Sequence, residues 1–351
     1  MKSYFRPEID AMAGYVPGEQ PKMANLVKLN TNENPFPPSP EVEKVLRSFD
    51  AGRMRRYPDP RADLLRSAIA ERNKVKKENV IIGNGSDDIL TMIFRSFTSP
   101  ELSMAMLYPS YSLYAELAAM QSAKVIRVPL TEKTFALPEN LLSLVRDANL
   151  LMLTRPNAPT GNSFDFRTIE DICTKFDGIV VIDEAYADFA EDNCMELAKK
   201  YPNVIVMRTF SKSCALAGLR LGYAVSSENI IEGLMKLKDS YNVDMLSQEI
   251  ALAAYNDTAY FDARVKEVKA MRATLKKELE KLGFHCVDSQ SNFLFAMPPD
   301  EDGERCFKGL RDEAVIVRYF PGDATGKYVR ITIGNPEENA RLLDVLRSIY
   351  A

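Results

Sequence analysis

The sequence predicts an α/β protein: a large domain with a mostly parallel central sheet flanked by helices, and a smaller α+β domain at the C-terminus. Three observations predict this fold. Over the first two thirds of the chain, short apolar segments alternate with helix-like segments. The apolar segments contain few polar residues, as is typical of parallel strands that helices cover on both faces. The last third combines a long helical stretch with short β-prone runs and a final helix.

The expected elements begin near residue 60, after a segment rich in Pro, Asn and Gly that cannot be mostly helix or central strand. Apolar periodicity predicts strands at 80–82, 103–107, 124–128, 150–154, 179–182, 204–207, 293–296, 315–317 and 328–333. Helices are expected at 62–74, 87–97, 226–255, 260–282 and 336–349. These patterns divide the chain into an N-terminal arm (1–30), a large domain (31–240) and a small domain (241–351) that packs with the arm.

Composition excludes several classes of function. The net charge is −4 and the basic residues are dispersed, so neither a nucleic-acid partner nor a membrane surface is expected. The chain has no 18-residue apolar run and no signal-peptide pattern at its start, and its five cysteines are scattered, which together predict a cytoplasmic protein with reduced thiols. The single histidine, His285, excludes zinc sites that need two or three histidines, and we expect no metal.

The segment around Lys212 is the most informative part of the chain. Lys212 follows an apolar β-prone run and stands among small residues, which is unusual for an exposed lysine. An amine held in a site can have its pKa lowered by burial and nearby cations until it acts as a nucleophile. Ser211 and Arg220 supply a hydroxyl and a forked cation, which together suit a phosphate.

Two further strand ends carry polar residues, and ligands bind at such ends in parallel sheets. Residues 83–87 (Gly-Asn-Gly-Ser-Asp) join a strand to a helix, where glycines and free N–H groups can bind an anion. Asp183 ends a very apolar strand and needs a partner, which could be a protonated ring nitrogen or an arginine. Tyr186 follows three residues later, and its phenol could reach a ring oxygen.

The chain resembles the pyridoxal-phosphate-dependent aminotransferases of fold type I, and within them the histidinol-phosphate aminotransferases. The motifs that carry the resemblance run nearly end to end: Leu29-Asn-Thr-Asn-Glu-Asn-Pro35, Arg56-Tyr-Pro-Asp59, Gly83-Asn-Gly-Ser-Asp87, Pro109-Ser-Tyr111, Pro156-Asn-Ala-Pro-Thr-Gly161, Ile182-Asp-Glu-Ala-Tyr186, Thr209-Phe-Ser-Lys212, Gly218-Leu-Arg220 and Val329-Arg-Ile-Thr-Ile-Gly334. The resemblance implies a homodimer that uses pyridoxal 5'-phosphate and acts on small amino-acid and phosphate substrates.

The resemblance also implies roles for the ring-binding residues. Lys212 would bind the cofactor aldehyde covalently and later move a proton between the substrate carbon and the cofactor. Asp183 would keep the pyridine nitrogen protonated, so that the ring accepts electrons. Tyr186 and Asn157 would hydrogen-bond the phenolic oxygen of the ring, and Tyr111 would stack on its face.

For the cofactor phosphate, the resemblance implies Ser211, Arg220 and the backbone of Gly85 and Ser86. Tyr57 would reach the same phosphate from the other subunit, with the N-terminal arm also near the partner's site. The family often has Asn-Asn-Pro-Thr-Gly where this chain has Asn157-Ala-Pro-Thr-Gly161. If the ring contact belongs to position 158, Asn157 must reach the ring from one residue earlier, or the contact is lost.

For the substrate, the resemblance implies that Arg330 binds the carboxylate of an amino acid, which a forked guanidinium can hold with two hydrogen bonds. Arg318 and Tyr15 could help to bind both a phosphate and a carboxylate in one pocket, and Asn292 could support that site. We expect Asn32 and Asn34 to brace the loop in which they lie, since asparagine favours turns of its own backbone.

The implied reaction transfers the amino group of L-histidinol phosphate to 2-oxoglutarate, giving imidazole acetol phosphate and L-glutamate. The alternatives are an aromatic or broad-specificity aminotransferase, a threonine-phosphate decarboxylase of the same fold, and a regulatory protein that has lost catalysis.

Overall fold

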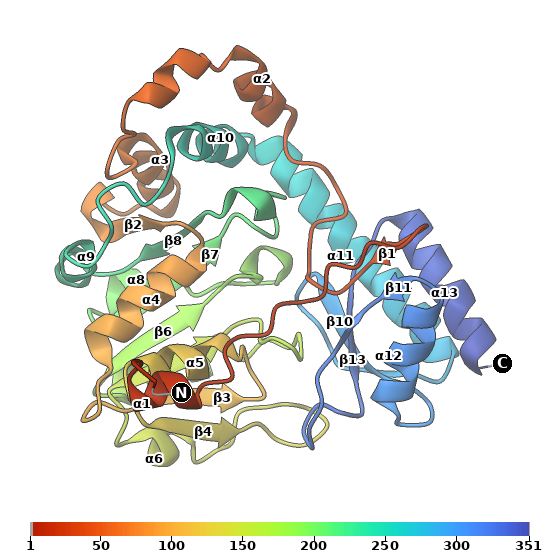
Figure 1. The fold of residues 1–351 in the computed structure, drawn as a ribbon. Helices are drawn as coiled ribbons and strands as arrows, with labels where there is room; N and C mark the ends of the chain where they lie inside the picture. The colour runs from red at the N-terminus through yellow and green to blue at the C-terminus, as the bar shows by residue number, and fades with distance from the viewer. Residues whose placement is uncertain (1–2, 351) are drawn as a thin grey trace.

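The computed structural model describes residues 3–350 and is organised around a seven-stranded sheet (Figure 1). The strands lie in the order β2 (Val80–Gly83), β8 (Gly222–Val225), β7 (Val204–Thr209), β6 (Ile179–Asp183), β5 (Leu150–Thr154), β3 (Met104–Tyr108) and β4 (Val125–Pro129). All neighbouring strands are parallel except β8, which is antiparallel to both β2 and β7. The predicted mostly parallel sheet is therefore confirmed.

Both faces of this sheet are buried, which explains why its strands are apolar throughout. Along β5, Leu151 and Leu153 belong to one hydrophobic cluster, whereas Leu150 and Met152 belong to another on the opposite face. The covering helices are α2 (Pro40–Ser48), α3 (Asp63–Asn73), α4 (Ser86–Phe97), α5 (Leu113–Met120), α6 (Leu141–Val145), α7 (Phe166–Lys175), α8 (Met195–Lys200), α9 (Glu228–Met235) and α10 (Met245–Asn256).

The C-terminal part forms a second core on a four-stranded antiparallel sheet. Its strands lie in the order β12 (Arg318–Tyr319), β13 (Val329–Thr332), β10 (Phe293–Met297) and β9 (His285–Cys286). Three helices belong to this part: α11 (Thr258–Lys281), α12 (Gly303–Asp312) and α13 (Pro336–Tyr350). None of the helices between residues 3 and 350 has both the length and the apolar character that crossing a membrane requires.

The N-terminal arm connects the two parts of the molecule. It begins with α1 (Pro7–Ala11), which contacts α5, and then runs across to the C-terminal part (Figure 1). There, β1 (Val27–Lys28) pairs in parallel with β11 (Val315–Ile316) in a separate two-stranded sheet. The predicted strand at 315–317 therefore exists, but its partner is the arm.

Two local features differ from the sequence-based expectation. The helix expected over 226–255 is two helices, α9 and α10, and Asp244 caps the second one by accepting a 2.8 Å hydrogen bond from the backbone N–H of Ser247. Helix α10 follows the expected domain boundary at residue 240, yet it packs against α2 and α3. Its Ile250 and Ala254 lie in the core of the large sheet, so the change from one core to the other occurs after α10.

Candidate active site

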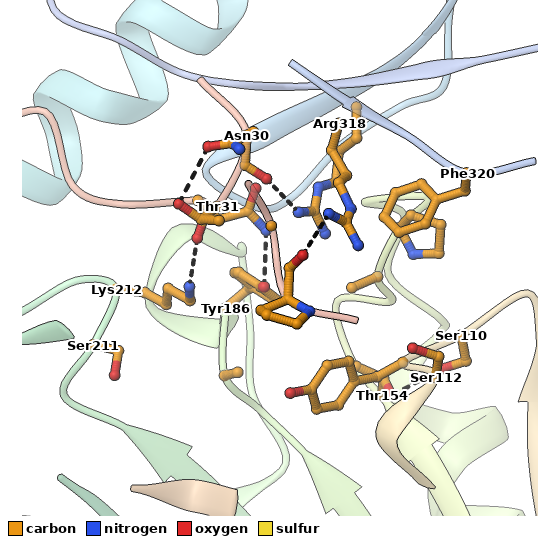
Figure 2. A pocket seen from close by; sticks show the side chains of 18 of the residues that line it. Asn30, Thr31, Ser110, Ser112, Thr154, Tyr186, Ser211, Lys212, Arg318 and Phe320 are labelled. Carbon is orange, nitrogen blue, oxygen red and sulfur yellow. Dashed lines mark hydrogen bonds between the residues drawn. The ribbon is translucent and has the colours of Figure 1, made fainter. Parts of the chain in front are cut away.

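A cavity of about 490 Å³ opens at the carboxyl ends of the parallel strands. Thr154, Asp183 and Thr209 line it, and they are the last residues of β5, β6 and β7. The arm and the C-terminal part close the opposite side, where Asn30, Thr31, Arg318 and Phe320 lie (Figure 2). The volume suits a small organic ligand, and the position is the one where open α/β sheets bind their ligands.

Lys212 lies in this cavity, in the loop that follows β7. Its Nζ donates a 2.9 Å hydrogen bond to the backbone carbonyl of Thr31 in the arm (Figure 2). Burial lowers the pKa of Lys212 to about 8, and the nearby charge of Arg330 acts in the same direction. At pH 7 about a tenth of this amine is therefore unprotonated, the form that a nucleophile or a base requires.

Asp183 is a buried carboxylate at the floor of the cavity. Its Oδ2 accepts a 2.6 Å hydrogen bond from the Tyr114 hydroxyl, and its Oδ1 accepts one of 3.1 Å from the backbone N–H of Ala185. Burial raises the pKa of Asp183, while these two hydrogen bonds act against the increase. No lysine or arginine within residues 3–350 forms an ion pair with it, so the carboxylate still lacks a cation.

Tyr186 presents its phenol from the loop after β6. The ring is buried against Phe293, with the ring centroids 5.1 Å apart, and the hydroxyl accepts a 2.9 Å hydrogen bond from Nδ2 of Asn32. Burial raises the pKa of the phenol, which therefore stays protonated. Tyr111 lies on another wall of the cavity, where its ring packs edge-on against Tyr15 and Tyr114.

An anion-binding cradle lies where α4 begins. Ser86 is the first residue of that helix, and no side chain caps the preceding Gly85. Arg220 reaches the same place, where Nη1 lies 3.4 Å from the Ser211 hydroxyl and Nη2 lies 3.1 Å from a carboxylate oxygen of Asp87. A helix N-terminus, a hydroxyl and a guanidinium are groups that can together hold a phosphate.

The glycine at position 85 is required in this cradle. Its φ is +86°, and a Cβ atom there would lie 2.7 Å from Nη2 of Arg220. Gly222 on β8 lets that strand pack closely against the start of α4, because a Cβ atom there would lie 2.5 Å from the backbone nitrogen of Ser86. At Gly222 the neighbouring atoms belong to the backbone and cannot move aside, whereas at Gly85 the neighbour is the end of a side chain and it is the positive φ that favours glycine.

Two arginines and a tyrosine line the opposite wall. Arg330 on β13 donates a 2.9 Å hydrogen bond to the carbonyl of Asn30, and its buried Nε has no partner among residues 3–350. Arg318 on β12 is paired with Arg330 in the sheet register and donates to the carbonyls of Val16 and Pro17 at 3.0 and 3.1 Å. Tyr15 precedes those two residues in the arm and lines the cavity.

Known proteins resemble this chain over nearly its whole length. The family model for aminotransferase class I and II matches residues 24–346. The chain belongs to the class I and II aminotransferases. It is 40% identical over 350 residues to histidinol-phosphate aminotransferase 1 of Nostoc sp., with 99% of each chain covered. It is 42% identical over 350 residues to the histidinol-phosphate aminotransferase of Geotalea daltonii, with 98% of this chain and 99% of the relative covered.

Solved structures agree with the fold of this aminotransferase. The histidinol-phosphate aminotransferase of Sinorhizobium meliloti, solved with pyridoxal-5'-phosphate, has a TM-score of 0.90 at 24% identity and covers 99% of both chains. A putative histidinol-phosphate aminotransferase from Erwinia carotovora has a TM-score of 0.85 at 26% identity, covering 92% of this chain and 96% of the other. The chain therefore has the same fold as these two solved structures.

Four residues that the sequence suggested for the aminotransferase site do not line the cavity: Asn157, Asn292, Tyr57 and Gly85. Asn157 is fully buried, and its Nδ2 donates to the Pro109 carbonyl at 3.0 Å and to the Thr160 hydroxyl at 2.8 Å. Ala158 lines the cavity in its place. Asn292 lies behind the wall and donates from Nδ2 to the carbonyl of Asn32 at 3.0 Å.

The third residue outside the cavity is Tyr57, which is 79% exposed. It stacks on Tyr241 with ring centroids 4.4 Å apart, in a surface groove that also contains Leu64 and Met245. Gly85 contributes through its backbone and its lack of a side chain, as described above. The structure therefore brings together Ser86, Tyr111, Asp183, Tyr186, Ser211, Lys212, Arg220, Arg330, Arg318 and Tyr15.

Sequence reasoning missed two contacts made within this constellation. Tyr114 lies in α5 and contacts Asp183 across 69 positions, so this contact does not follow from its neighbours in the sequence. The Asn32 side chain, which the sequence predicts as a brace of the arm loop, contacts the Tyr186 hydroxyl. No local pattern indicates that contact, because it joins residues separated by 154 positions.

Proposed function

We propose that this aminotransferase uses pyridoxal 5'-phosphate to transfer the amino group of L-histidinol phosphate to 2-oxoglutarate. The products would be imidazole acetol phosphate and L-glutamate, in a step of histidine biosynthesis. The observation that carries the proposal is a single cavity in which a low-pKa amine, an unpaired buried carboxylate and an anion cradle face one another. The relatives that are 40% and 42% identical over nearly the full chain are histidinol-phosphate aminotransferases, which supports this substrate.

The surroundings of Asp183 fit the pyridine ring of the cofactor. A buried carboxylate without a cation is costly, and a protonated ring nitrogen would supply the missing charge. The hydrogen bonds from Tyr114 and Ala185 already fix the direction of the carboxylate. Asp183 would therefore hold the proton on the ring nitrogen, and Tyr111 would lie against the ring face.

The cradle at the start of α4 fits the cofactor phosphate. Arg220 forms an ion pair with Asp87, and a phosphate would offer the guanidinium a stronger, doubly charged partner. Ser211 and the backbone N–H of Ser86 would donate further hydrogen bonds. A side chain at position 85 would occupy the space that Arg220 needs, which supports the assignment of this loop to phosphate binding.

When bound, pyridoxal phosphate withdraws electrons from the substrate carbon that carries the amino group. The Nζ atom of Lys212 would accept the proton of that carbon and then donate it to the cofactor. The lowered pKa of Lys212 favours both directions of transfer. Tyr186 would donate its hydroxyl hydrogen toward the ring oxygen. The arm and Phe320 would exclude water from above the ring.

The two arginines on the opposite wall suit the two anions of the proposed reaction. Histidinol phosphate carries a phosphate where an amino acid has its carboxylate, so one pocket must bind both groups. Arg330 has an unsatisfied Nε at this wall, and Arg318 could exchange the arm carbonyls of Val16 and Pro17 for a charged oxygen. Tyr15 would add a hydroxyl from the arm.

We also propose that the protein acts as a homodimer in which Tyr57 serves the partner's site. Tyr57, Leu64 and Met54 are 79%, 75% and 60% exposed, which is unusual for large apolar side chains on a monomer surface. Tyr57 does not line the cavity of its own chain. A second subunit covering this surface would bury these side chains and bring the Tyr57 hydroxyl to a cofactor phosphate.

The experiment that tests the function is spectroscopic. L-Histidinol phosphate is added to the purified, cofactor-loaded protein without any keto acid, and we expect the visible cofactor absorbance to change to the near-ultraviolet absorbance of its amine form. Loss of the visible band with glutamate or an aromatic amino acid, but not with histidinol phosphate, would retain the aminotransferase and overturn its substrate. Release of carbon dioxide from threonine phosphate would instead indicate a decarboxylase.

A further inference from the structure

Asn32 connects the C-terminal sheet to the Tyr186 phenol. The residue is 1% exposed and has a φ of 56°, a left-handed conformation that asparagine tolerates better than most residues. Its backbone N–H donates a 3.0 Å hydrogen bond to the Thr332 hydroxyl on β13, and Nδ2 of Asn292 donates to its carbonyl at 3.0 Å. The residue is therefore held through its backbone while its side chain faces Tyr186.

These contacts determine which end of the Asn32 amide faces the phenol. The Thr332 hydroxyl accepts from the Asn32 backbone, and its single hydrogen is then donated to Oδ1 of Asn32 at 3.2 Å. With Oδ1 occupied as an acceptor, Nδ2 is the end that lies 2.9 Å from the Tyr186 hydroxyl oxygen. An amide nitrogen can only donate, so the phenol oxygen accepts and its own hydrogen stays free.

The direction of the Asn32–Tyr186 hydrogen bond is important because residue 158 is an alanine and cannot donate a hydrogen bond itself. Ala158 lines the cavity and has no polar side-chain atom, while the Asn157 amide nitrogen already donates to the Pro109 carbonyl and the Thr160 hydroxyl. Of the residues 157, 158 and 186, only Tyr186 can then donate a side-chain hydrogen bond into the cavity. Its donor hydrogen must point inward for this to happen.

We propose that Asn32 is a positioning residue that makes the Tyr186 phenol a donor toward the ring oxygen of the cofactor. This inference rests on the proposed function, because the ring oxygen belongs to pyridoxal phosphate. A donor at that oxygen stabilises its negative charge, and so lowers the pH at which the lysine-bound cofactor loses its proton. Asn32 acts through Tyr186 and not on the reacting atoms themselves.

The test replaces the donor with an acceptor of the same shape. In Asn32→Asp, the carboxylate accepts the Tyr186 hydrogen and turns it away from the cavity. We expect the pH midpoint of the visible absorbance to rise by about one unit, the size expected for losing one hydrogen bond to a charged oxygen. We also expect cofactor affinity, measured by titration of the apoprotein, to fall about tenfold.

The Tyr186→Phe protein provides a second background, which distinguishes the direction of the Asn32–Tyr186 hydrogen bond from the charge that Asn32→Asp adds. In Tyr186→Phe, the Asn32→Asp change should leave the midpoint where Tyr186→Phe alone puts it, because there is no phenol to turn. A further rise in that background would show that the introduced carboxylate acts by its charge or by disturbing the fold, and would overturn the proposal.

Thr332→Val and Thr332→Ser provide a matched pair if Asn32→Asp does not fold. Valine removes the hydroxyl that orients the amide and should raise the midpoint, whereas serine keeps the hydroxyl and should leave it unchanged. Equal midpoints in both would contradict the proposal. If the wild-type protein develops no visible band with pyridoxal phosphate, the proposed function fails; a wild-type band with unmoved variants refutes this inference alone.

Discussion

The hydroxyl of Tyr114 lies 2.6 Å from Oδ2 of Asp183, with both groups buried beneath the cavity floor. The same hydroxyl lies 2.9 Å from the Thr154 hydroxyl at the end of the neighbouring strand β5. Tyr114 thus joins a helix to the ends of two strands through one oxygen. Its hydrogen bond is also the largest influence that opposes the burial-driven rise in the pKa of Asp183.

Tyr114→Phe should therefore weaken both the fold and the site. Without the donor, the pKa of Asp183 rises further, and the carboxylate becomes a poorer partner for a protonated ring nitrogen. We expect a loss of about 1–3 kcal/mol in the free energy of unfolding and about a tenfold fall in kcat. Tyr260→Phe is the control, since it removes a hydroxyl that donates to the Pro37 carbonyl at 2.9 Å away from the cavity. Equal effects of both changes would contradict a specific role.

Lys212→Ala should abolish the visible absorbance of the bound cofactor and lower turnover by at least about 10²- to 10⁴-fold, because both the covalent attachment and the proton transfer are lost. Absorbance spectra and a coupled glutamate assay measure the two effects. Lys199→Ala, on a lysine paired with Glu196 in α8, should change neither. Persistence of the visible band in Lys212→Ala would remove Lys212 from the site.

The rate at which the apoprotein captures pyridoxal phosphate should depend on pH. Burial lowers the pKa of Lys212 to about 8, so the rate constant should rise with pH through that value and level off above it. Because the unfolded chain retains the proton up to about the usual lysine pKa of 10.5, stability of the apoprotein should also increase with pH between these values. Stopped-flow absorbance and chemical denaturation measure the two quantities.

Two neighbours of Lys212 test the cause of this pH dependence. Arg330→Met removes a cation that disfavours the ammonium form and should move the capture midpoint upward. Glu33→Gln removes an anion that favours the ammonium form and should move it downward. Shifts in the same direction for both variants would contradict an electrostatic origin.

Mixing two variant subunits, Tyr57→Phe and Lys212→Ala, tests the role of Tyr57 across the proposed dimer. Tyr57→Phe alone should weaken cofactor affinity about tenfold, the loss expected for one hydrogen bond to a phosphate. In a mixed dimer with Lys212→Ala, one site contains Lys212 from one subunit and Tyr57 from the other. That site should recover wild-type cofactor affinity, whereas affinity would stay low if Tyr57 served its own subunit.

The strands and the residues at their ends were predictable because local patterns encode them. An apolar run ending in Asp183, or in Ser211 and Lys212, places those side chains at the carboxyl edge of a parallel sheet whatever the rest of the chain does. The cavity accordingly contains most of the residues that the sequence suggested.

The remaining contacts depend on tertiary packing, which the sequence alone does not display. Asn157 turns away from the cavity because the Pro109 carbonyl and Thr160 satisfy its amide. Asn32 reaches Tyr186 only because Thr332, 300 positions later, holds it in place. Helix α10 joins the large core although it follows the expected boundary, since its apolar face meets α2 and α3.

The path of the arm has a consequence for synthesis of the chain. Val27 and Lys28 pair with β11, and Asn32 is held by Thr332. The side of the cavity that the arm closes can therefore form only after almost the whole polypeptide has left the ribosome. The sheet below needs no residue beyond 225 for its strands. A chain that ends before residue 315 would thus carry Lys212 and Asp183 at the ends of the sheet strands without the contacts of the arm to β11 and Thr332.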